Sequence, residues 1–300
     1  MGRLSTRIAT TRGVLLMGVL NRTPDSFSDG GTFVDHDAAL ARVRSMLAEG
    51  AALVDVGAES TRPGAAPVSA AEQIARVGTI VAEATSLGAI VSIDTTLPEV
   101  AEHALSQGAA VVNSVSLEPA AELGSLCARH GAALVLMHCR GSMSAMQGFS
   151  VYADDAYGDV VADVGREWRA AAARALGAGL DASELLLDPG LGFAKNARQS
   201  LELVARLDEL CALGHAVVAG PSRKSFLVAG MQPAPPPGER LGATIAASLA
   251  CARRGARVLR VHDVGAVAQA LRLDAAVASV TPRASDPVAA KARRVEVHRG

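Results

Sequence analysis

Polar side chains that end short apolar runs suit the binding of a nitrogen heterocycle. Asp94 and Asp188 each end such a run, and Asn113 ends a run that lies between them in the chain. A carboxylate at such a place can bind a metal, act as a base, accept hydrogen bonds from ring nitrogens, or cap the following helix. Together with the Asn113 amide, the two aspartates form a donor–acceptor set that fits the edge of a 2-amino-4-oxo ring. Glycines at 190 and 192 would let the backbone approach such a ligand closely.

The placement of lysine supports a charged site near the same loops. The chain has 29 basic residues, and because Lys195, Lys224 and Lys291 are its lysines, 26 are arginines. Lys195 follows Asp188 closely, and Lys224 ends the segment 220–224, which reads GPSRK. An ammonium is a compact charge with rotatable donors, whereas a guanidinium is a planar fork. A chain that otherwise uses arginine is therefore expected to need an ammonium at these two places.

A second group of side chains suits an anion. Arg260 and His262 flank Val261 in an apolar run, so both are expected to face the same interior, and Arg62 with Thr61 follows another run. Arginine binds phosphate through two parallel hydrogen bonds. Asn21 offers a neutral oxygen that, beside a pyrophosphate, could be one ligand of a Mg²⁺ ion that keeps most of its water. Ser222 and Arg223 are expected to open a helix whose free N–H groups could hold a carboxylate.

Eight β-rich apolar runs position these residues. Continuous apolar runs are typical of buried parallel strands, and the stretches between them have the spacing of amphipathic helices. The alternation predicts an α/β protein, with a (β/α)8 TIM barrel favoured over an open sheet, and with its active site where the strands end. Helices are expected at 98–105, 241–252 and 267–273, and one that opens with the capping box 69–72. The predicted strands are 14–20, 53–57, 90–93, 111–112, 134–137, 185–187, 216–219 and 258–259.

Length and composition indicate one domain. Residues 14–281 are predicted to form the barrel, with a flexible N-terminal segment at 1–13 and a polar C-terminal tail at 282–300. The loops 22–33 and 58–68 are expected to cover the strand ends. A net charge of −1 gives no reason to expect a nucleic acid or a membrane as a partner. The four cysteines lack metal-ligand spacing and are interpreted as reduced thiols in a cytoplasmic protein.

These motifs closely resemble the dihydropteroate synthase family of the folate pathway. The resemblance extends over most of the chain, from residue 17 to residue 264, and its motifs occur in the family's order. They are MGVLNRTPDSFSDGG at 17–31, ESTRPG at 59–64, SIDT at 92–95, LMH at 136–138, DPGLGF at 188–193, GPSRKS at 220–225 and RVHDV at 260–264.

The resemblance implies a barrel that joins 7,8-dihydropterin-6-ylmethyl diphosphate to 4-aminobenzoate and releases pyrophosphate. It further implies a Mg²⁺ cofactor, a homodimer, and an aminobenzoate site that accepts sulfonamides. The implied mechanism is similar to an SN1 displacement, in which pyrophosphate leaves first and the aromatic amine then attacks the methylene cation. The implied pterin set is Asp94, Asn113, Met137, Asp188, Phe193 and Lys224. The implied pyrophosphate set is Asn21, Thr61, Arg62, Arg260 and His262, with Asn21 also the metal ligand. The implied 4-aminobenzoate set is Phe27, Thr61, Pro63, Ser222, Arg223 and Lys224, and the residues expected to carry catalysis are Lys224, Arg260, His262 and Asp94.

Two departures from the family pattern keep alternatives open. The chain has Asn113-Ser114 where the family usually has Asn-Asp, and Arg22 where it has a small aliphatic residue. One alternative is a non-catalytic pterin-binding paralogue. The other is a methyltetrahydrofolate:corrinoid methyltransferase, a barrel enzyme that has no need of an anion site. The intact sequence STRP at 60–63 favours the active synthase.

Overall fold

The molecule is a closed barrel of eight parallel strands. The computed structural model describes residues 2–22, 32–59, 67–141 and 152–280. Each strand pairs with the next one in the chain, and β8 pairs with β1 to close the ring. All eight predicted strands are confirmed. They are β1 (Leu15–Asn21), β2 (Leu53–Gly57), β3 (Ile90–Asp94), β4 (Val111–Ser114), β5 (Ala133–Met137), β6 (Leu185–Asp188), β7 (Ala216–Ala219) and β8 (Val258–Val261).

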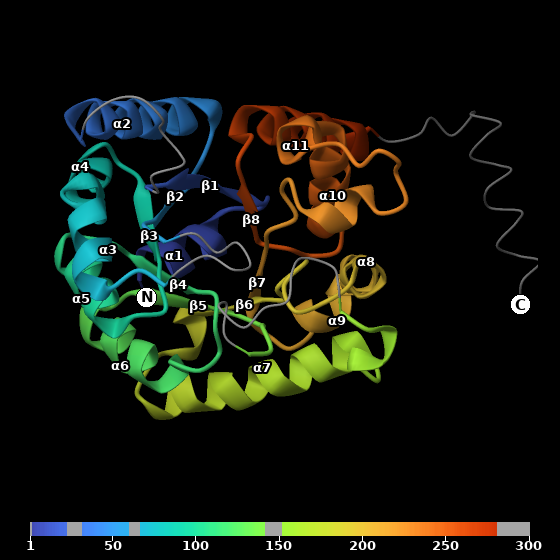
Figure 1. Ribbon diagram of the computed structural model, residues 1–300, viewed down its shortest axis with the longest axis horizontal. Coiled ribbons are helices and arrows are strands. Elements are labelled where there is room, and N and C mark those ends of the chain that lie inside the picture. The colour runs from blue at the N-terminus through green and yellow to red at the C-terminus, as the bar shows by residue number, and fades with distance from the viewer. Residues whose placement is uncertain (1, 23–31, 60–66, 142–151, 281–300) are drawn as a thin grey trace, which may run out of the picture.

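Helices form a layer around the strands, as the alternating pattern predicts (Figure 1). The four expected helices correspond to α3, α5, α10 and α11. Helices α2 and α11 lie side by side where the ring closes (Figure 1). The helices of this layer are α2 (Thr32–Glu49), α3 (Ala70–Val77), α4 (Ile80–Ser86), α5 (Pro98–Ser106), α6 (Ala120–His130), α7 (Val160–Gly177), α8 (Ala197–Ala205), α9 (Leu207–Cys211), α10 (Leu241–Arg253) and α11 (Val264–Ser279).

Local sequence signals fix where these helices begin. The Ser69 hydroxyl accepts a hydrogen bond from the Glu72 amide at the start of α3, and Pro98 is the first residue of α5. Asn196 and Gln199 form a reciprocal capping box at the start of α8. Neither Asp94 nor Asp188 caps the helix that follows it, since α5 begins after Leu97 and α8 after Asn196. Both aspartates are therefore left for the interior of the barrel.

The barrel interior has an apolar layer below a polar one. Side chains two residues apart on a strand point to the same side. Leu53, Val111, Leu186 and Val258 pack together inside the barrel. Two residues further along the same strands stand Asp55, Asn113, Asp188 and Arg260. The two-residue period of the strands therefore places these polar side chains directly above the apolar layer, at the carboxyl-terminal end of the barrel. We call the apolar layer the apolar plug.

The first residues of the chain close the opposite end of the barrel. Residues Arg3–Thr10 form α1, whose Leu4 is fully buried in the apolar plug. Glu184 accepts hydrogen bonds from the Gly2 amide and the Ser5 hydroxyl, and Arg257 donates to the carbonyls of Ile8 and Thr11. The prediction of a flexible segment at 1–13 is therefore wrong. The buried Leu4 and polar partners from distant parts of the sequence hold the helix in place, and a helix of this length is too short to show an amphipathic pattern in the sequence. The tail at 282–300 lies outside the described residues.

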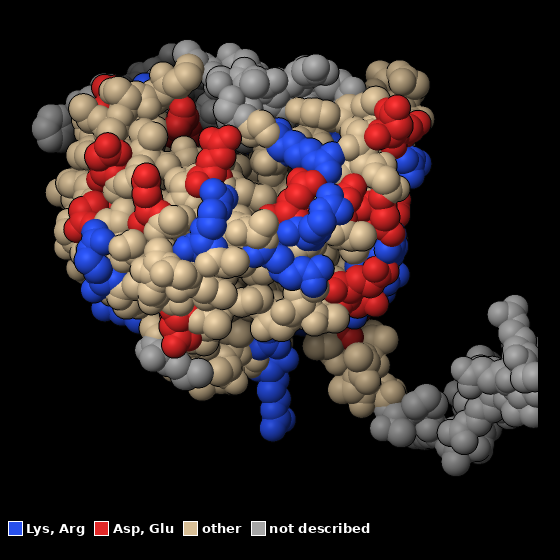
Figure 2. Space-filling view, turned by 90° about the horizontal axis from the view of Figure 1, so that it is seen from below, with Lys and Arg blue, Asp and Glu red and all other residues tan. Residues whose placement is uncertain are grey.

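The outer surface carries mixed charge. Figure 2 shows one face on which acidic and basic side chains are interspersed. Arg206, for example, forms ion pairs with Asp159, Glu202 and Glu209. In the described part of the chain, no helix is both long and apolar enough to cross a membrane.

Candidate active site

Arg260 joins two carboxylates at the centre of the polar layer. Its Nε donates to Asp55 Oδ2 at 2.7 Å, and its Nη2 donates to Asp94 Oδ2 at 2.8 Å. The same Asp55 oxygen accepts from Asn113 Nδ2 at 3.1 Å, while Asp55 Oδ1 is buried and has no partner among the residues that the structure describes. Burial raises the pKa of Asp94 to about 7, although Arg260 opposes the shift. The structure therefore brings together three predicted residues: Arg260 bonds directly to Asp94, and Asp55, which was not predicted, links Arg260 to Asn113.

Asp55 was missed because it lies inside an apolar run and not at the end of one. The one available signal was a charged residue within the sequence LVDVG of β2. Its side chain is fully buried, and its partner Arg260 is 205 residues away in the sequence.

Asp188 and Lys224 face each other across a turn that follows β6. Asp188 Oδ1 accepts from the Gly190 amide at 2.7 Å, and Lys224 Nζ donates to the Leu191 carbonyl at 2.6 Å. Burial raises the pKa of Asp188, with Lys224 opposing the shift, and burial lowers the pKa of Lys224 to about 8. Lys224 also lies 4.2 Å from the ring centre of Phe193. A carboxylate, an ammonium and an aromatic face therefore meet here.

An apolar wall adjoins this pair. Met137 and Phe193, both predicted to line a pterin pocket, are buried in one cluster with Val115 and Cys139. Such a wall offers a flat ring one dry face while the polar layer meets its edge.

Ser222 holds His262 in one orientation. The Ser222 hydroxyl oxygen accepts from the backbone amide of His262 at 3.2 Å and lies 3.0 Å from His262 Nδ1. With the Ser222 hydroxyl assigned as the donor to Nδ1, the imidazole proton is on Nε2. Burial, together with Arg260 and Arg223, lowers the pKa of His262 to about 4. His262 is thus a neutral N–H donor at neutral pH.

The predicted helix at Ser222 and Arg223 is wrong. Arg223 has φ of 61°, which is incompatible with a right-handed helix, and the following residues Ser225–Val228 form a single 3₁₀ turn. The guanidinium of Arg223 instead forms a two-bond ion pair with Asp263, at 3.0 and 2.6 Å. A cradle of helix N–H groups for a carboxylate is therefore absent at this place.

Asn21 lies close to Asp94, at the end of β1. A Cβ atom built on Gly57 would be 3.6 Å from Asn21 Oδ1 and 3.7 Å from Asp94 Oδ2, so the glycine leaves space between them. Within the described residues, no cluster of three His, Cys, Asp or Glu side chains could hold a metal ion. One amide oxygen nevertheless suits Mg²⁺ that takes its other ligands from phosphate and water. Phe27, Thr61, Arg62 and Pro63 lie outside the described residues.

The two departures from the family pattern have contacts away from this layer. Arg22 Nε donates to the Arg76 carbonyl at the C-terminal end of α3, at 3.0 Å. Ser114 follows Asn113 on the strand and so faces the other side, where its hydroxyl donates to the Ser116 carbonyl at 2.8 Å. Arg22 thus has a contact with the outer helix layer, and Ser114 has one with the turn that follows β4.

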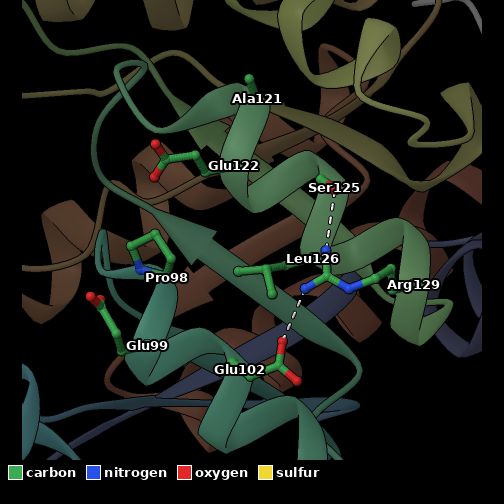
Figure 3. Close-up of a pocket in the computed structure, with 8 residues that line it drawn as sticks. All are labelled: Pro98, Glu99, Glu102, Ala121, Glu122, Ser125, Leu126 and Arg129. Atoms are coloured by element: carbon green, nitrogen blue, oxygen red, sulfur yellow. Dashed lines mark hydrogen bonds and ion pairs between the residues drawn. The ribbon is translucent and has the colours of Figure 1, made fainter.

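A hollow on the outer surface is unrelated to this layer. It lies between α5 and α6 and is lined by Glu99, Glu102, Glu122 and Arg129 among others (Figure 3). Arg129 donates to Ser125 and Glu102, so its charge is paired (Figure 3). Both helices belong to the outer layer, and the hollow receives none of the polar side chains at the strand ends.

Comparison with known proteins agrees with the geometry. A family model described as pterin binding enzyme matches residues 17–262. Dihydropteroate synthase of Mycobacterium leprae is 45% identical over 267 residues, which cover 87% of this chain and 92% of that protein. The chain belongs to the dihydropteroate synthase family.

Solved structures extend the likeness to three dimensions. Xanthomonas albilineans dihydropteroate synthase with 4-aminobenzoic acid is 38% identical, with a TM-score of 0.81, over 90% of this chain and 95% of that one. The same enzyme in complex with 7,8-dihydropteroate is 35% identical, with a TM-score of 0.78 and the same coverage. The barrel and the family predicted from the motifs are confirmed, and the roles of individual residues stay predictions.

Proposed function

We propose that the protein joins (7,8-dihydropterin-6-yl)methyl diphosphate to 4-aminobenzoate, giving 7,8-dihydropteroate and pyrophosphate. The observation that carries the proposal is the buried ion cluster of Arg260, Asp55 and Asp94 beside Asp188 and Lys224. Family membership and the solved complexes of relatives with aminobenzoate and dihydropteroate support the same reaction. The C–O bond breaks and its electron pair leaves with the diphosphate, which gives a methylene cation. The lone pair of the aniline nitrogen then bonds to the methylene carbon, and the resulting anilinium gives its proton to water.

The pterin half of the site is assigned to the polar layer and the apolar wall. Asp94, Asn113 and Asp188 offer acceptors and a donor to the ring edge, while Met137 and Phe193 cover one face. As positive charge develops on the pterinylmethyl group, the carboxylates of Asp94 and Asp188 stabilise it at close range in a poorly solvated interior. The neutral aniline needs no strong base, because the anilinium it forms is itself acidic.

The diphosphate half is assigned to Arg260 and His262, together with Arg62. The neutral His262 donates from Nε2 to a phosphate oxygen and does not act as a general acid, since its pKa is about 4. Mg²⁺, held by Asn21 and the diphosphate itself, would neutralise charge on the leaving group. These cationic groups favour the synthase over a corrinoid-dependent methyltransferase. The contact of Ser114 with the Ser116 carbonyl, away from the polar layer, likewise favours the active enzyme over a paralogue without activity.

The 4-aminobenzoate half is assigned to the neighbourhood of the turn that follows β7. Phe27, Thr61 and Pro63 lie outside the described residues, and Ser222 and Arg223 are held by His262 and Asp263. We assign the carboxylate of the substrate to the neighbourhood of Ser222, and we expect sulfonamides to compete for the same place.

Product formation with each component omitted tests the proposal. Purified protein is given the pterin diphosphate, Mg²⁺ and 4-aminobenzoate, and pyrophosphate is measured with time. Release that needs all three components supports the synthase. Release without 4-aminobenzoate would indicate hydrolysis, and no release despite tight pterin binding would indicate the paralogue. Asn21→Ala should raise the Mg²⁺ concentration for half-maximal rate, with Arg22→Ala as the neighbouring control.

We propose that the active form is a homodimer in the cytoplasm. Helix α11 exposes Leu273 and Val277 one turn apart, with exposed fractions of 66% and 64%, and a second copy of the chain could cover this apolar face. All four cysteines are free thiols, as a reducing compartment allows. Sedimentation should give twice the chain mass for the wild type and the chain mass for Leu273→Glu. Arg272→Glu, an exposed change on the same helix, serves as the control.

A further inference from the structure

Lys195 is fully buried at the edge of the pterin half of the site, and in the described part of the chain the acceptors around its ammonium belong to two segments. Nζ donates to the carbonyls of Phe193 at 3.0 Å, Gly190 at 3.2 Å and His138 at 3.3 Å. It also lies 3.1 Å from His138 Nδ1. Because burying an ammonium is costly unless its protons are bonded, this geometry holds the two segments together.

The turn at 190–194 directs its carbonyls toward buried donors. Gly190 and Phe193 bond to Lys195, Leu191 bonds to Lys224 at 2.6 Å, and Ala194 accepts from the Tyr157 hydroxyl at 2.9 Å. Ala194 has φ of 48°, a strained conformation for a residue with a side chain. Such a turn needs external bonds to keep its shape, and Lys195 supplies two of them.

His138 carries the other side of the contact. Nε2 lies 2.9 Å from Glu167 Oε2 on α7, and because an ionised carboxylate only accepts, the imidazole proton is on Nε2 and Nδ1 is an acceptor facing Lys195. Hydrogen bonds from His138 and Arg140 hold the pKa of Glu167 well below its usual range. Arg140 donates to both carboxylate oxygens of Glu167 and lies 3.9 Å above the Tyr157 ring. The lysine is therefore linked to a rigid outer helix.

We infer that Lys195 is a positioning residue for the pterin substrate. It holds the 190–193 turn against the end of β5. Through this turn it places the Phe193 ring, the Leu191 carbonyl that orients Lys224, and the Gly190 amide that orients Asp188. The inference rests on the proposed function, because it takes the pterin to bind among these three side chains. Lys195 itself contacts protein groups that lie behind the site.

The Lys195→Met variant tests the inference, since methionine fills a similar volume without the donors. We expect KM for the pterin diphosphate to rise about tenfold to a hundredfold, as for a misplaced binding group. KM for 4-aminobenzoate should stay within about twofold, and kcat at saturating pterin should fall by a smaller factor than the pterin KM rises, because Asp188 also stabilises the developing cation. Arg198→Met is the matched control, because it removes an exposed basic side chain near the same turn and should leave all three constants unchanged.

A second readout follows the His138 ring directly. In the wild type, nitrogen NMR should show Nδ1 as an acceptor and Nε2 as protonated, and Lys195→Met should lose this signature. If that variant does not fold, Tyr157→Phe removes one bond from the turn and should raise the pterin KM about threefold to tenfold. An unchanged pterin KM, or equal losses for both substrates, would overturn the inference.

The same design separates this inference from the proposed function. If the wild type forms no product, the proposed function fails, and calorimetric titration with 6-hydroxymethyl-7,8-dihydropterin still compares the variants. Weaker pterin binding by Lys195→Met with normal binding by Arg198→Met then supports the positioning role. Equal binding by both variants contradicts it.

Discussion

Removing the Arg260 charge should destabilise the fold as well as stop the reaction. Arg260→Met leaves Asp55 and Asp94 as two buried carboxylates without their cation. Breaking a buried pair by removing one partner costs about 3–5 kcal/mol. For a chain of 300 residues, an unfolding entropy of about 2.1 cal/mol/K per residue converts this into a fall in Tm of about 5–8 °C. Arg206→Met, whose three partners are on the surface, should cost at most about 1 kcal/mol.

The pH dependence of this loss identifies its cause. The folded-state pKa of Asp94 is about 7, above its unfolded value, so ionising it costs stability as pH rises. Without Arg260 the pKa of Asp94 rises further. The loss of unfolding free energy in Arg260→Met, relative to the wild type, should therefore be larger at pH 8.5 than at pH 6. Calorimetric scans at both pH values measure it, and adding Asp55→Asn should restore part of the stability. A variant as stable as the wild type, or one with a larger deficit at pH 6, would refute the charge argument.

Three further predictions follow from the site. Gly190→Ala should lose at least about 2 kcal/mol of unfolding free energy in urea, because its Cβ would lie 2.0 Å from the His138 carbonyl oxygen. The control is Gly88→Ala, which has the same sign of φ but open space around its Cβ, and so measures the backbone strain alone. Ser222→Ala should lower kcat about tenfold by freeing the His262 ring, and a change confined to the 4-aminobenzoate KM would contradict this role. The kcat/KM for the pterin diphosphate should rise through about pH 7, as Asp94 ionises, and fall above about pH 8, as Lys224 loses its proton. A profile without the alkaline fall would show that the Lys224 charge is not needed.

The strand ends could be predicted because a polar residue follows nearly every continuous apolar run in the sequence. Asp94, Asn113 and Asp188 each follow a continuous apolar run, and the polarity changes where the strand reaches the mouth of the barrel. The closure of the barrel then brings residues from distant parts of the sequence to one layer. The sequence motifs were sufficient to identify the family, and the structure agrees with it.

Contacts that depend on register and loop conformation could not be predicted. Asp55 and Arg260 meet across the barrel only because the strands are staggered, with β1 between them in the sheet. The left-handed conformation of Arg223 has no signal in the segment GPSRK, so a helix was expected where a 3₁₀ turn forms. Lys195 was noticed for its residue type, but its four acceptors depend on the shape of the turn it holds.

The stoichiometry of a single turnover tests the central claim most directly. Enzyme in excess over the pterin diphosphate, with Mg²⁺ and 4-aminobenzoate, is quenched at intervals, and both products are measured by mass spectrometry. We expect one 7,8-dihydropteroate for each pyrophosphate at every time point. Pyrophosphate with 6-hydroxymethyl-7,8-dihydropterin in place of dihydropteroate, or no pyrophosphate at all, would contradict it.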